Sequence, residues 1–302
     1  MRSANARPLV GIHALVFVSG WSQEEATRGV RLCRETGYDF IEIPLLDPTS
    51  VDVASTSALL DETGLEATCS LGLSFDTDTS AVDLEVATRG ERLLEQALEV
   101  AHGLGAHYLG GVIYSAMGKY MEPATVAGRR AAREILKRIA ARAEALDVRV
   151  GVEPVNRYES NLLNTSSQAI EFIQDVGSPN LVVHLDTYHM NIEEEPASAI
   201  RAAADYLGYV HVGESNRGYL GRGTIDFEAI FDALVAIKYA GPIAFESFST
   251  AVISQDFASA LAVWREPWTD GTDVARHARE FIRARLESRI TSDAGSESHG
   301  KK

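Results

Sequence analysis

The sequence predicts a single α/β domain in which eight parallel strands, each followed by a helix, close into a (β/α)8 TIM barrel. Three observations support this prediction. Short apolar runs recur about every 26 to 42 residues, the size of one strand–helix unit. Helical patterns lie between these runs, and we find no linker that divides the 302 residues into two domains. Eight alternating units favour a closed barrel over an open sheet, and barrels of this length form one domain.

The predicted strands are short stretches rich in apolar and β-branched residues. In chain order they cover Val10–Leu15, Phe40–Leu45, Glu66–Leu73, His107–Ile113, Arg149–Glu153, Leu181–Asp186, Tyr209–Gly213 and Ile243–Phe248.

Helix boundaries also follow from the local sequence. Ser22–Thr36 opens with a capping-box pattern, because Glu25 follows Ser22 by three residues. Helical periodicity with charged outer faces covers Ala81–Leu104 and Pro123–Leu146. Four glycines stand just before strands, where a helix C-cap is expected: Gly37, Gly64, Gly105 and Gly241.

The barrel is predicted to span residues 8–287. Trp264–Asp273 is expected to form a loop after the eighth strand, and Val274–Leu286 the last helix. Residues 288–302 are mostly Ser, Asp, Gly, His and Lys with little apolar content, so we expect a disordered polar tail there.

Composition limits the classes of function. The formal net charge is −15, and a negative surface repels the phosphate backbone of nucleic acids. The sequence shows no basic amphipathic stretch, long apolar run or signal-peptide pattern, so we expect no membrane partner and a cytoplasmic location. Two isolated cysteines, Cys33 and Cys69, make neither a disulfide framework nor a zinc ribbon and are expected to be buried thiols.

Four ionisable residues share one position in the last four predicted strands. Each stands near the carboxyl end of its strand, with a parity opposite to that of the apolar side chains: Glu153, Asp186, His211 and Glu246. In a barrel the apolar side chains pack under the helices, so these four point inward near the C-terminal mouth. One acid at a strand end is commonly a cap or an ion-pair partner, but four in successive strands with one parity are hard to attribute to chance.

Three carboxylates and an imidazole that converge in a barrel would be costly to bury without partners. A divalent cation resolves this problem by offsetting most of the negative charge. The mainly oxygen ligand set suits Mn²⁺, Mg²⁺ or Co²⁺, and the lack of thiolate argues against structural zinc. We therefore predict one divalent ion at the C-terminal mouth of the strands.

The loops after these strands carry three further candidates. Glu159 lies in a loop rich in hydrogen-bonding groups, and His189 follows Asp186 by three residues. Arg217 lies in a glycine-rich loop and offers a fixed fork of donors to hydroxyl or enolate oxygens. Alternative roles stay open: a surface charge for Glu159, an ion-pair partner for Arg217 and a hydrogen bonder behind the ligands for His189.

Two more strand residues have inward parity. We expect His184 to be a packed, hydrogen-bonded histidine of the barrel interior, and Glu42 to support the metal ligands from behind. The glycine-rich loop lacks G-x-G-x-x-G between a strand and a helix, so it predicts no dinucleotide site.

At these residues the chain resembles the ketose 3-epimerases, the group of D-tagatose, D-allulose and L-ribulose 3-epimerases in the xylose-isomerase-like barrel superfamily. The resemblance covers roughly Val10 to Leu286 in order and spacing. Its most specific pieces are Glu153-Pro-Val-Asn-Arg-Tyr-Glu159, Leu185-Asp-Thr-Tyr-His-Met-Asn-Ile-Glu-Glu194 and Gly213-Glu-Ser-Asn-Arg-Gly-Tyr-Leu-Gly-Arg-Gly223. The early segments that are similar as well are Phe40-Ile-Glu-Ile-Pro-Leu-Leu-Asp-Pro48 and Gly11-Ile-His13.

The resemblance implies a role for individual residues. The family's metal ligands, usually of Mn²⁺ or Co²⁺, match Glu153, Asp186, His211 and Glu246. Residues that bind the ketose around O1 to O3 match Glu159, His189 and Arg217. Aromatic residues near the sugar match Tyr114 and Phe248.

The resemblance also implies a homodimer or homotetramer. The sequence departs from the family pattern at Phe227, where many relatives carry Trp, and around Ser74–Ser80. The preferred ketose therefore stays open.

The implied reaction is reversible inversion at C3 of a free, neutral ketose through a cis-enediolate. Glu153 and Glu246 would act as acid and base on opposite faces of the sugar, because a single carboxylate would return the proton to the same face. The metal, Arg217 and His189 would stabilise the developing negative charge. A sugar phosphate is disfavoured, because no glycine-rich phosphate cup follows the seventh and eighth strands.

Other readings of the same barrel stay open. An aldose–ketose or hydroxypyruvate-type isomerase would share the metal ligands but move a proton between C1 and C2; the loop Ser215–Gly223 favours the epimerases. A lyase of the inosose dehydratase type is a further alternative. An endonuclease-IV-like phosphodiesterase would need a histidine-rich multi-zinc cluster and a basic face. A non-catalytic sugar-binding protein would need no paired acids.

Overall fold

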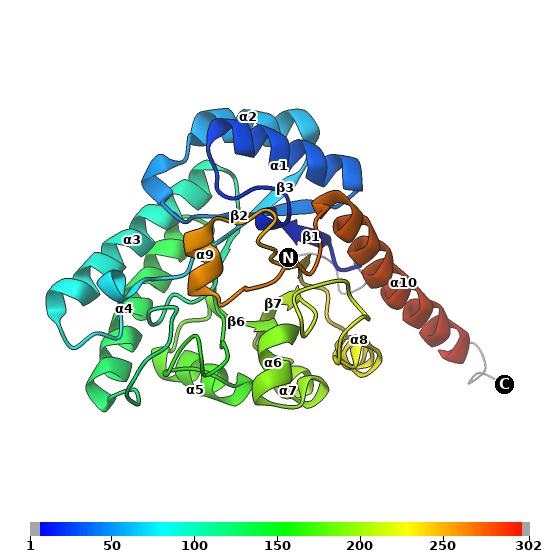
Figure 1. Cartoon of the computed structure of the whole chain (residues 1–302). Coiled ribbons are helices and arrows are strands. Elements are labelled where there is room, and N and C mark those ends of the chain that lie inside the picture. Colours follow the sequence, from blue (N-terminus) through cyan, green and yellow to red (C-terminus); the bar gives the residue numbers. More distant parts are fainter. Residues whose placement is uncertain (1–6, 298–302) are drawn as a thin grey trace.

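The computed structural model describes residues 7–297 and contains the predicted barrel. Its strands pair in parallel in chain order, and the last strand pairs with the first to close the sheet (Figure 1). The strands are β1 (Val10–His13), β2 (Phe40–Pro44), β3 (Glu66–Ser70), β4 (Tyr108–Gly110), β5 (Arg149–Val152), β6 (Leu181–Asp186), β7 (Leu207–Val212) and β8 (Ile243–Phe245).

Helices surround this barrel (Figure 1). They are α1 (Gln23–Thr36), α2 (Val53–Thr63), α3 (Leu84–Gly103), α4 (Val126–Ala145), α5 (Ser166–Val176), α6 (Thr187–Glu193), α7 (Pro196–Ala203), α8 (Phe227–Ala236), α9 (Gln255–Ala260) and α10 (Gly271–Glu297). Short 3-10 turns are η1 (Ala14–Val16), η2 (Pro48–Ser50) and η3 (Phe75–Thr77). Because all the strands point the same way, their carboxyl ends and the loops after them meet at one end of the barrel.

The first helices begin and end as predicted. Ser22 caps α1 with its hydroxyl, which accepts from the backbone N–H of Glu25, while the Glu25 carboxylate accepts from the backbone N–H of Ser22. Gly37 and Gly64 end α1 and α2 in the left-handed region, with φ of 80° and 65°. Glycine takes this conformation without the steric cost that a Cβ brings.

One predicted helix end is wrong. Gly241 was expected to cap the helix before β8, but α8 already ends at Ala236, and Lys238 takes the left-handed conformation with φ of 54°. Gly241 instead leaves room for the Tyr239 ring, whose hydroxyl donates to the carbonyl of Pro242.

Several strands end earlier than their apolar runs. β1 stops at His13 because the chain then turns into η1. β4 stops at Gly110 because Gly111 is left-handed, with φ of 116°. β8 stops at Phe245. The apolar residues beyond these ends are buried among the loops of the mouth, so apolar character continues where strand pairing does not.

The last helix is longer than predicted. α10 begins at Gly271 and continues to Glu297, so the tail expected to be disordered from Ser288 is helical as far as Glu297; residues 298–302 lie outside the described residues. Its later turns are tied to α8, because Arg289 pairs with Asp232 and Glu228. These ion pairs extend the helix beyond its apolar stretch.

Apolar side chains form two main packed regions. The larger region lies between the strands and the helices and includes the outward strand residues Val150, Val152, Val183 and Leu185. The smaller region fills the inside of the barrel: Phe40, Tyr108, Val182, Tyr209 and Ala244.

The aromatic rings inside the barrel need glycine on neighbouring strands. A Cβ on Gly11 would lie 2.2 Å from the Phe40 ring, and a Cβ on Gly151 would lie 1.9 Å from the Tyr108 hydroxyl. The rings of Tyr108 and Tyr209 stack with centroids 4.3 Å apart. This filling closes the barrel and leaves polar inward residues only nearer the mouth.

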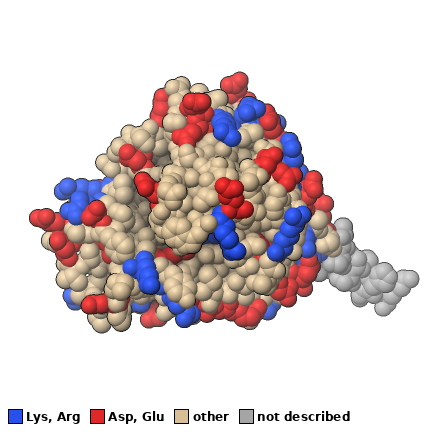
Figure 2. Space-filling view, viewed as in Figure 1, with Lys and Arg blue, Asp and Glu red and all other residues tan. Residues whose placement is uncertain are grey.

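The surface carries mixed charge. On the face shown in Figure 2, Lys and Arg are interspersed with Asp and Glu rather than gathered in one patch. Within residues 7–297, no helix combines the length and the apolar character that crossing a membrane requires. Cys33 and Cys69 are both buried free thiols, as predicted.

The two stacked tyrosines, Tyr108 and Tyr209, should respond differently to substitution by Phe, as measured by the free energy of unfolding. Among the described residues the buried Tyr108 hydroxyl has no hydrogen-bond partner, whereas the Tyr209 hydroxyl donates to Glu42 at 2.7 Å and lies 2.9 Å from the Thr68 hydroxyl. Tyr108→Phe should keep or raise the free energy of unfolding, and Tyr209→Phe should lower it by about 1–3 kcal/mol. Urea unfolding of both variants measures this. Equal losses would show that the Tyr108 hydroxyl has a partner after all.

Candidate active site

The four predicted metal ligands lie close together at the mouth of the barrel, where Glu153, His211 and Glu246 line a cavity and Asp186 is buried beside them. Glu153 directly follows β5, Asp186 ends β6, His211 lies in β7 and Glu246 directly follows β8. Each is at most 7% exposed. Their strands pair side by side, with Asp186 opposite His211 and His211 opposite Ala244, so the side chains of one parity converge.

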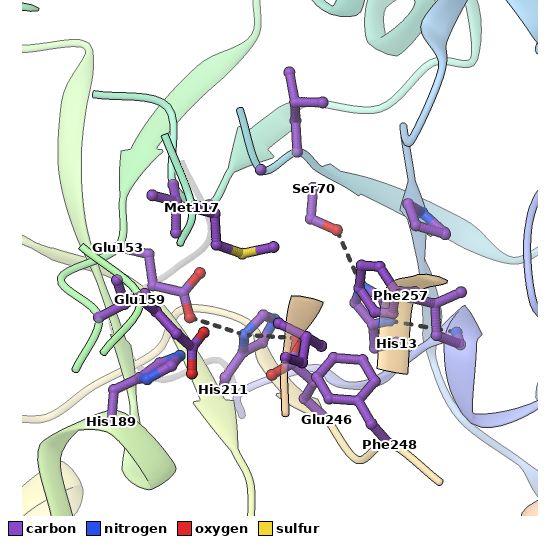
Figure 3. Close-up of a pocket in the computed structure, with 18 of the residues that line it drawn as sticks. His13, Ser70, Met117, Glu153, Glu159, His189, His211, Glu246, Phe248 and Phe257 are labelled. Carbon is purple, nitrogen blue, oxygen red and sulfur yellow. Dashed lines mark hydrogen bonds and ion pairs between the residues drawn. The ribbon is translucent and has the colours of Figure 1, made fainter. Parts of the chain in front are cut away.

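The cavity has a polar side and an apolar side, and its volume is about 630 Å³. Glu153, Glu159 and His189 stand on one side of it, with His211 and Glu246 in the middle (Figure 3). The opposite side includes His13, Phe248 and Phe257 (Figure 3). Apolar walls are completed by Leu15, Pro44, Leu46, Met117 and Leu261.

The acids lie close to the imidazole of His211. Its Nδ1 is 3.4 Å from Glu153 Oε1 and 3.5 Å from Glu246 Oε1. Ligand atoms of Asp186, His211 and Glu246 all lie within 4.8 Å of one another, and Glu153 forms overlapping groups of the same kind with Asp186 and with His211. Within the described residues, His211 Nδ1 and Asp186 Oδ2 are buried without a hydrogen-bond partner. Buried ligand atoms that lie close together without hydrogen bonds suit a bound cation.

Glu42 orients His211 from behind. His211 Nε2 donates to Glu42 Oε2 at 2.8 Å, and the Tyr209 hydroxyl donates to the same oxygen. Burial alone would raise the pKa of Glu42, but His211 outweighs it and holds that pKa well below its ordinary value. Because Nε2 is engaged, only Nδ1 of His211 faces the cavity. The expected supporting role of Glu42 fits this arrangement.

Arg217 neutralises two of the acids. Its Nη1 lies 2.7 Å from Glu246 Oε2 and 3.1 Å from Asp186 Oδ2. The guanidinium stacks between two rings, 3.9 Å from the centroid of Tyr188 and 5.1 Å from that of Phe248. Arg217 is 8% exposed, so this pairing is largely screened from water.

The backbone of Arg217 is held in an unusual conformation by residues that sequence reasoning missed. Its φ is 54°, which costs energy for a residue with a side chain. Its N–H donates to the carbonyl of Glu214, and its own carbonyl accepts from Ser247 Oγ at 2.5 Å. The Trp268 indole N–H donates in turn to Ser247 Oγ at 2.6 Å. No pattern in the sequence connects Ser247 or Trp268 with Arg217.

Asn156 links Glu159 to His189. Its amide nitrogen donates to Glu159 Oε1 at 2.8 Å and lies 2.9 Å from His189 Nδ1, which also accepts from the Asn156 backbone N–H. Burial, then Arg217, holds the pKa of His189 well below its ordinary value. His189 is therefore neutral, and its Nε2–H points toward Asp186 Oδ2, 3.6 Å away. Asn156 was also missed, although it lies inside a quoted motif.

Two aromatic candidates have different positions. Phe248 lines the cavity, as expected. Tyr114 does not: it is fully buried, and its hydroxyl donates to the carbonyls of Glu153 and Leu163. It contacts the backbone of Glu153, and its place near the sugar stays a prediction.

His184 differs from expectation in one respect. It packs as predicted, with its ring centroid 4.2 Å from that of His211 and 4.7 Å from that of Tyr209. Within residues 7–297, however, neither ring nitrogen has a hydrogen-bond partner. The expected hydrogen bonds are therefore not formed by the described residues. Its Nδ1 lies 4.0 Å from Glu153 Oε2.

Glu153 and Glu246 have pKa values on opposite sides of the ordinary value. Burial, helped by the charges of Glu246 and Asp186, raises the pKa of Glu153 to about 7 despite His211. Burial would raise the pKa of Glu246 as well, but His211 and Arg217 outweigh it and lower that pKa. Near neutral pH the pair can therefore hold one proton and one negative charge.

Comparisons with known proteins agree with this geometry. The sequence matches the xylose isomerase-like TIM barrel family over residues 30–285. It is 48% identical over 278 residues to a ketose 3-epimerase of Arthrobacter globiformis, covering 92% of this chain and 96% of that protein. It is 46% identical over 276 residues to an L-ribulose 3-epimerase of Methylomonas sp., covering 91% and 96%. A crystal structure of D-allulose 3-epimerase from Methylomonas sp. with D-allulose has a TM-score of 0.91 at 45% identity, covering 93% and 98%.

The chain therefore belongs to the xylose isomerase-like TIM barrel family and, within it, to the ketose 3-epimerases, as the sequence predicted. These are carbohydrate epimerases of the isomerase class.

The raised pKa of Glu153 predicts how the metal-free protein responds to pH. Between the ordinary value of 4.5 and about 7, folded Glu153 binds a proton that the unfolded chain has lost, so stability falls as pH rises. The raised pKa of His211 acts in the same direction above its ordinary value of 6.5. Below 6.5 the lowered pKa values of His13, His184 and His189 act in the opposite direction, so the fall is expected above that pH. The melting temperature of chelator-treated protein should drop by roughly 5 °C between about pH 6.5 and pH 8.

A bound cation replaces the proton on His211 Nδ1, so Mn²⁺ should raise the melting temperature more at the higher pH. Differential scanning fluorimetry with and without Mn²⁺ measures both effects. Glu153→Gln is the control and should flatten the pH slope. A melting temperature that rises with pH in the metal-free protein would contradict this account of Glu153.

Proposed function

We propose that the chain inverts the configuration at C3 of free ketohexoses and ketopentoses, with Glu153 and Glu246 as paired acid and base and a divalent cation as cofactor. The observation that carries this proposal is the pair of buried glutamates in one cavity, with pKa values moved in opposite directions. Inversion needs a proton removed from one face of the carbon and returned to the other. Two carboxylates in different protonation states can do this.

The cation would be held by Glu153, Asp186, His211 and Glu246. Asp186 Oδ2 and His211 Nδ1 are buried and form no hydrogen bond among the described residues, which supports this assignment. The excess of oxygen over nitrogen donors suits Mn²⁺, Co²⁺ or Mg²⁺. When bound, such an ion polarises the ketose carbonyl and makes the neighbouring C3–H more acidic.

The protein side chains then move the proton. In one direction the ionised Glu246 removes the C3 proton and leaves a cis-enediolate. Glu153 carries a proton and returns it to C3 from the opposite face. In the reverse direction the two roles exchange, since each carboxylate ends the cycle in the state from which the other began.

Polar side chains on one side of the cavity would bind the oxygens O1 to O3. His189 Nε2–H and the Arg217 guanidinium donate hydrogen bonds, and Glu159 accepts them from hydroxyl groups. Phe248 and the other apolar walls would meet the rest of the carbon chain. Among the described residues that line the cavity, Arg217 is the one Lys or Arg, and it already pairs with Glu246 and Asp186. A neutral ketose suits this cavity better than a sugar phosphate.

We further propose Mn²⁺ as the physiological ion, a homodimer or homotetramer as the assembly and the cytoplasm as the location. These three proposals come from the resemblance to the ketose 3-epimerases.

A product assay tests the reaction. Metal-loaded protein is incubated with D-fructose, D-tagatose and L-ribulose in D₂O, and chelator-stripped protein serves as the control. We expect a C3 epimer with deuterium at C3, detected by NMR and sugar chromatography, and loss of this activity when metal is removed. An aldose with deuterium at C2 would indicate the alternative isomerase, and no exchange at any carbon would overturn the ketose proposal.

The roles of the two glutamates are tested by substitution. Glu153→Gln and Glu246→Gln should each lower the rate of C3 inversion by at least about 100-fold, because each removes one of the two proton carriers. Circular dichroism and the bound metal content are measured for both variants, since both residues are proposed ligands.

Glu171→Gln, a change at an exposed glutamate of α5, is the matched control and should keep full activity. Near wild-type inversion in either active-site variant would rule out the two-acid mechanism.

A further inference from the structure

A second cavity adjoins the cavity of the barrel mouth. Its volume is about 550 Å³, and we call it the outer cavity. It shares four lining side chains with the mouth cavity: Glu159, Arg217, Phe248 and Leu261. Its other walls come from α6 and from the loops after β7 and β8: Tyr188, Ser215, Asn216, Ala262, Val263, Trp264, Arg265 and Pro267.

The guanidinium of Arg217 stands between the two cavities. One of its faces stacks on Tyr188, which lines only the outer cavity, while its Nη1 pairs with Glu246 on the inner side. The ion pairs hold this partition in place. The two cavities are therefore neighbouring parts of one site, and the Arg217 side chain forms the wall between them.

The outer cavity offers unused donors next to an aromatic surface. Trp264 is 69% exposed, whereas Trp21 is 7% and Trp268 is 3% exposed. Within the described part of the chain, the Tyr188 hydroxyl, the Asn216 amide nitrogen and the Arg265 guanidinium have no hydrogen-bond or ion-pair partner.

A pyranose ring has the complementary chemistry. Its C–H face packs on an aromatic ring, and its hydroxyl groups accept from amide, phenol and guanidinium donors. A cavity with an aromatic wall and a few convergent polar groups is the usual form of such a site.

We propose that the outer cavity binds a sugar unit attached to O1 of the ketose, so that the chain also epimerises glycosylated ketoses at C3. This inference rests on the proposed function, in which Glu159, His189 and Arg217 bind O1 to O3. A substituent on O1 leads toward the wall that the two cavities share. A substituent at the far end of the carbon chain leads toward Leu15 and Phe257, which do not line the outer cavity.

The test compares three ketoses in D₂O with metal-loaded protein: D-fructose, the disaccharide with a glucosyl unit on O1 of fructose, and its isomer with the glucosyl unit on O6. The disaccharide substituted on O1 should exchange at C3 and give its epimer, and the isomer substituted on O6 should react much more slowly. Trp264→Ala should lower kcat/KM for the O1-substituted sugar about tenfold through the loss of stacking, and leave D-fructose within about twofold. Trp264→Phe keeps an aromatic face and should restore most of the difference.

The results distinguish failure of this inference from failure of the proposed C3 epimerisation. Turnover of D-fructose without turnover of the O1-substituted sugar would overturn this inference and leave the proposed function intact. Equal losses for both sugars in Trp264→Ala would also overturn it, because Trp264 would then support the fold rather than bind the glucosyl unit. Protein that exchanges none of the three sugars would overturn the proposed function and this inference together.

Discussion

Charge balance in the barrel mouth is the constraint on which the rest of the structure depends. Five acidic side chains are buried there against two cationic side chains, His211 and Arg217. The acids are Glu42, Glu153, Glu159, Asp186 and Glu246. Unpaired burial of an ionised acid is too costly for a folded domain to tolerate. The observed geometry offsets this cost, because each cation contacts at least two acids. Glu153 has no ion pair with Arg217, and its pKa is raised to about 7.

The same charge balance gives the two proposed catalytic acids, Glu153 and Glu246, different pKa values. Glu153 and Glu246 are equally buried, and both lie about as far from His211 Nδ1. Only Glu246 has an ion pair with Arg217. This contact helps to lower the pKa of Glu246, while the charges of Glu246 and Asp186 help burial to raise that of Glu153. A divalent cation would replace the proton on His211 Nδ1, so this nitrogen would bind metal and holds a proton without it.

The regular part of this arrangement could be predicted from the sequence. Side-chain alternation in four successive strands placed Glu153, Asp186, His211 and Glu246 on the inner face, because strand parity is a local property. Strand ends could not be placed as well, since the apolar runs continue into the loops of the mouth. The burial of Tyr114 under the β5 loop could not be predicted either, because it depends on packing between distant segments. The link from Trp268 through Ser247 to Arg217 is likewise tertiary and leaves no pattern in the sequence.

Arg217 joins this charge balance to the shape of the ligand site. Its left-handed backbone costs roughly 1–2 kcal/mol for a residue with a Cβ, and the hydrogen bonds to Glu214 and Ser247 hold it there. Moving the guanidinium to enlarge the mouth cavity would leave Asp186 and Glu246 without their partner. The wall between the two cavities is therefore rigid for an electrostatic reason. A substituent on the ketose has to pass beside a fixed guanidinium. The carbon that carries the substituent therefore affects binding more than the size of the substituent does.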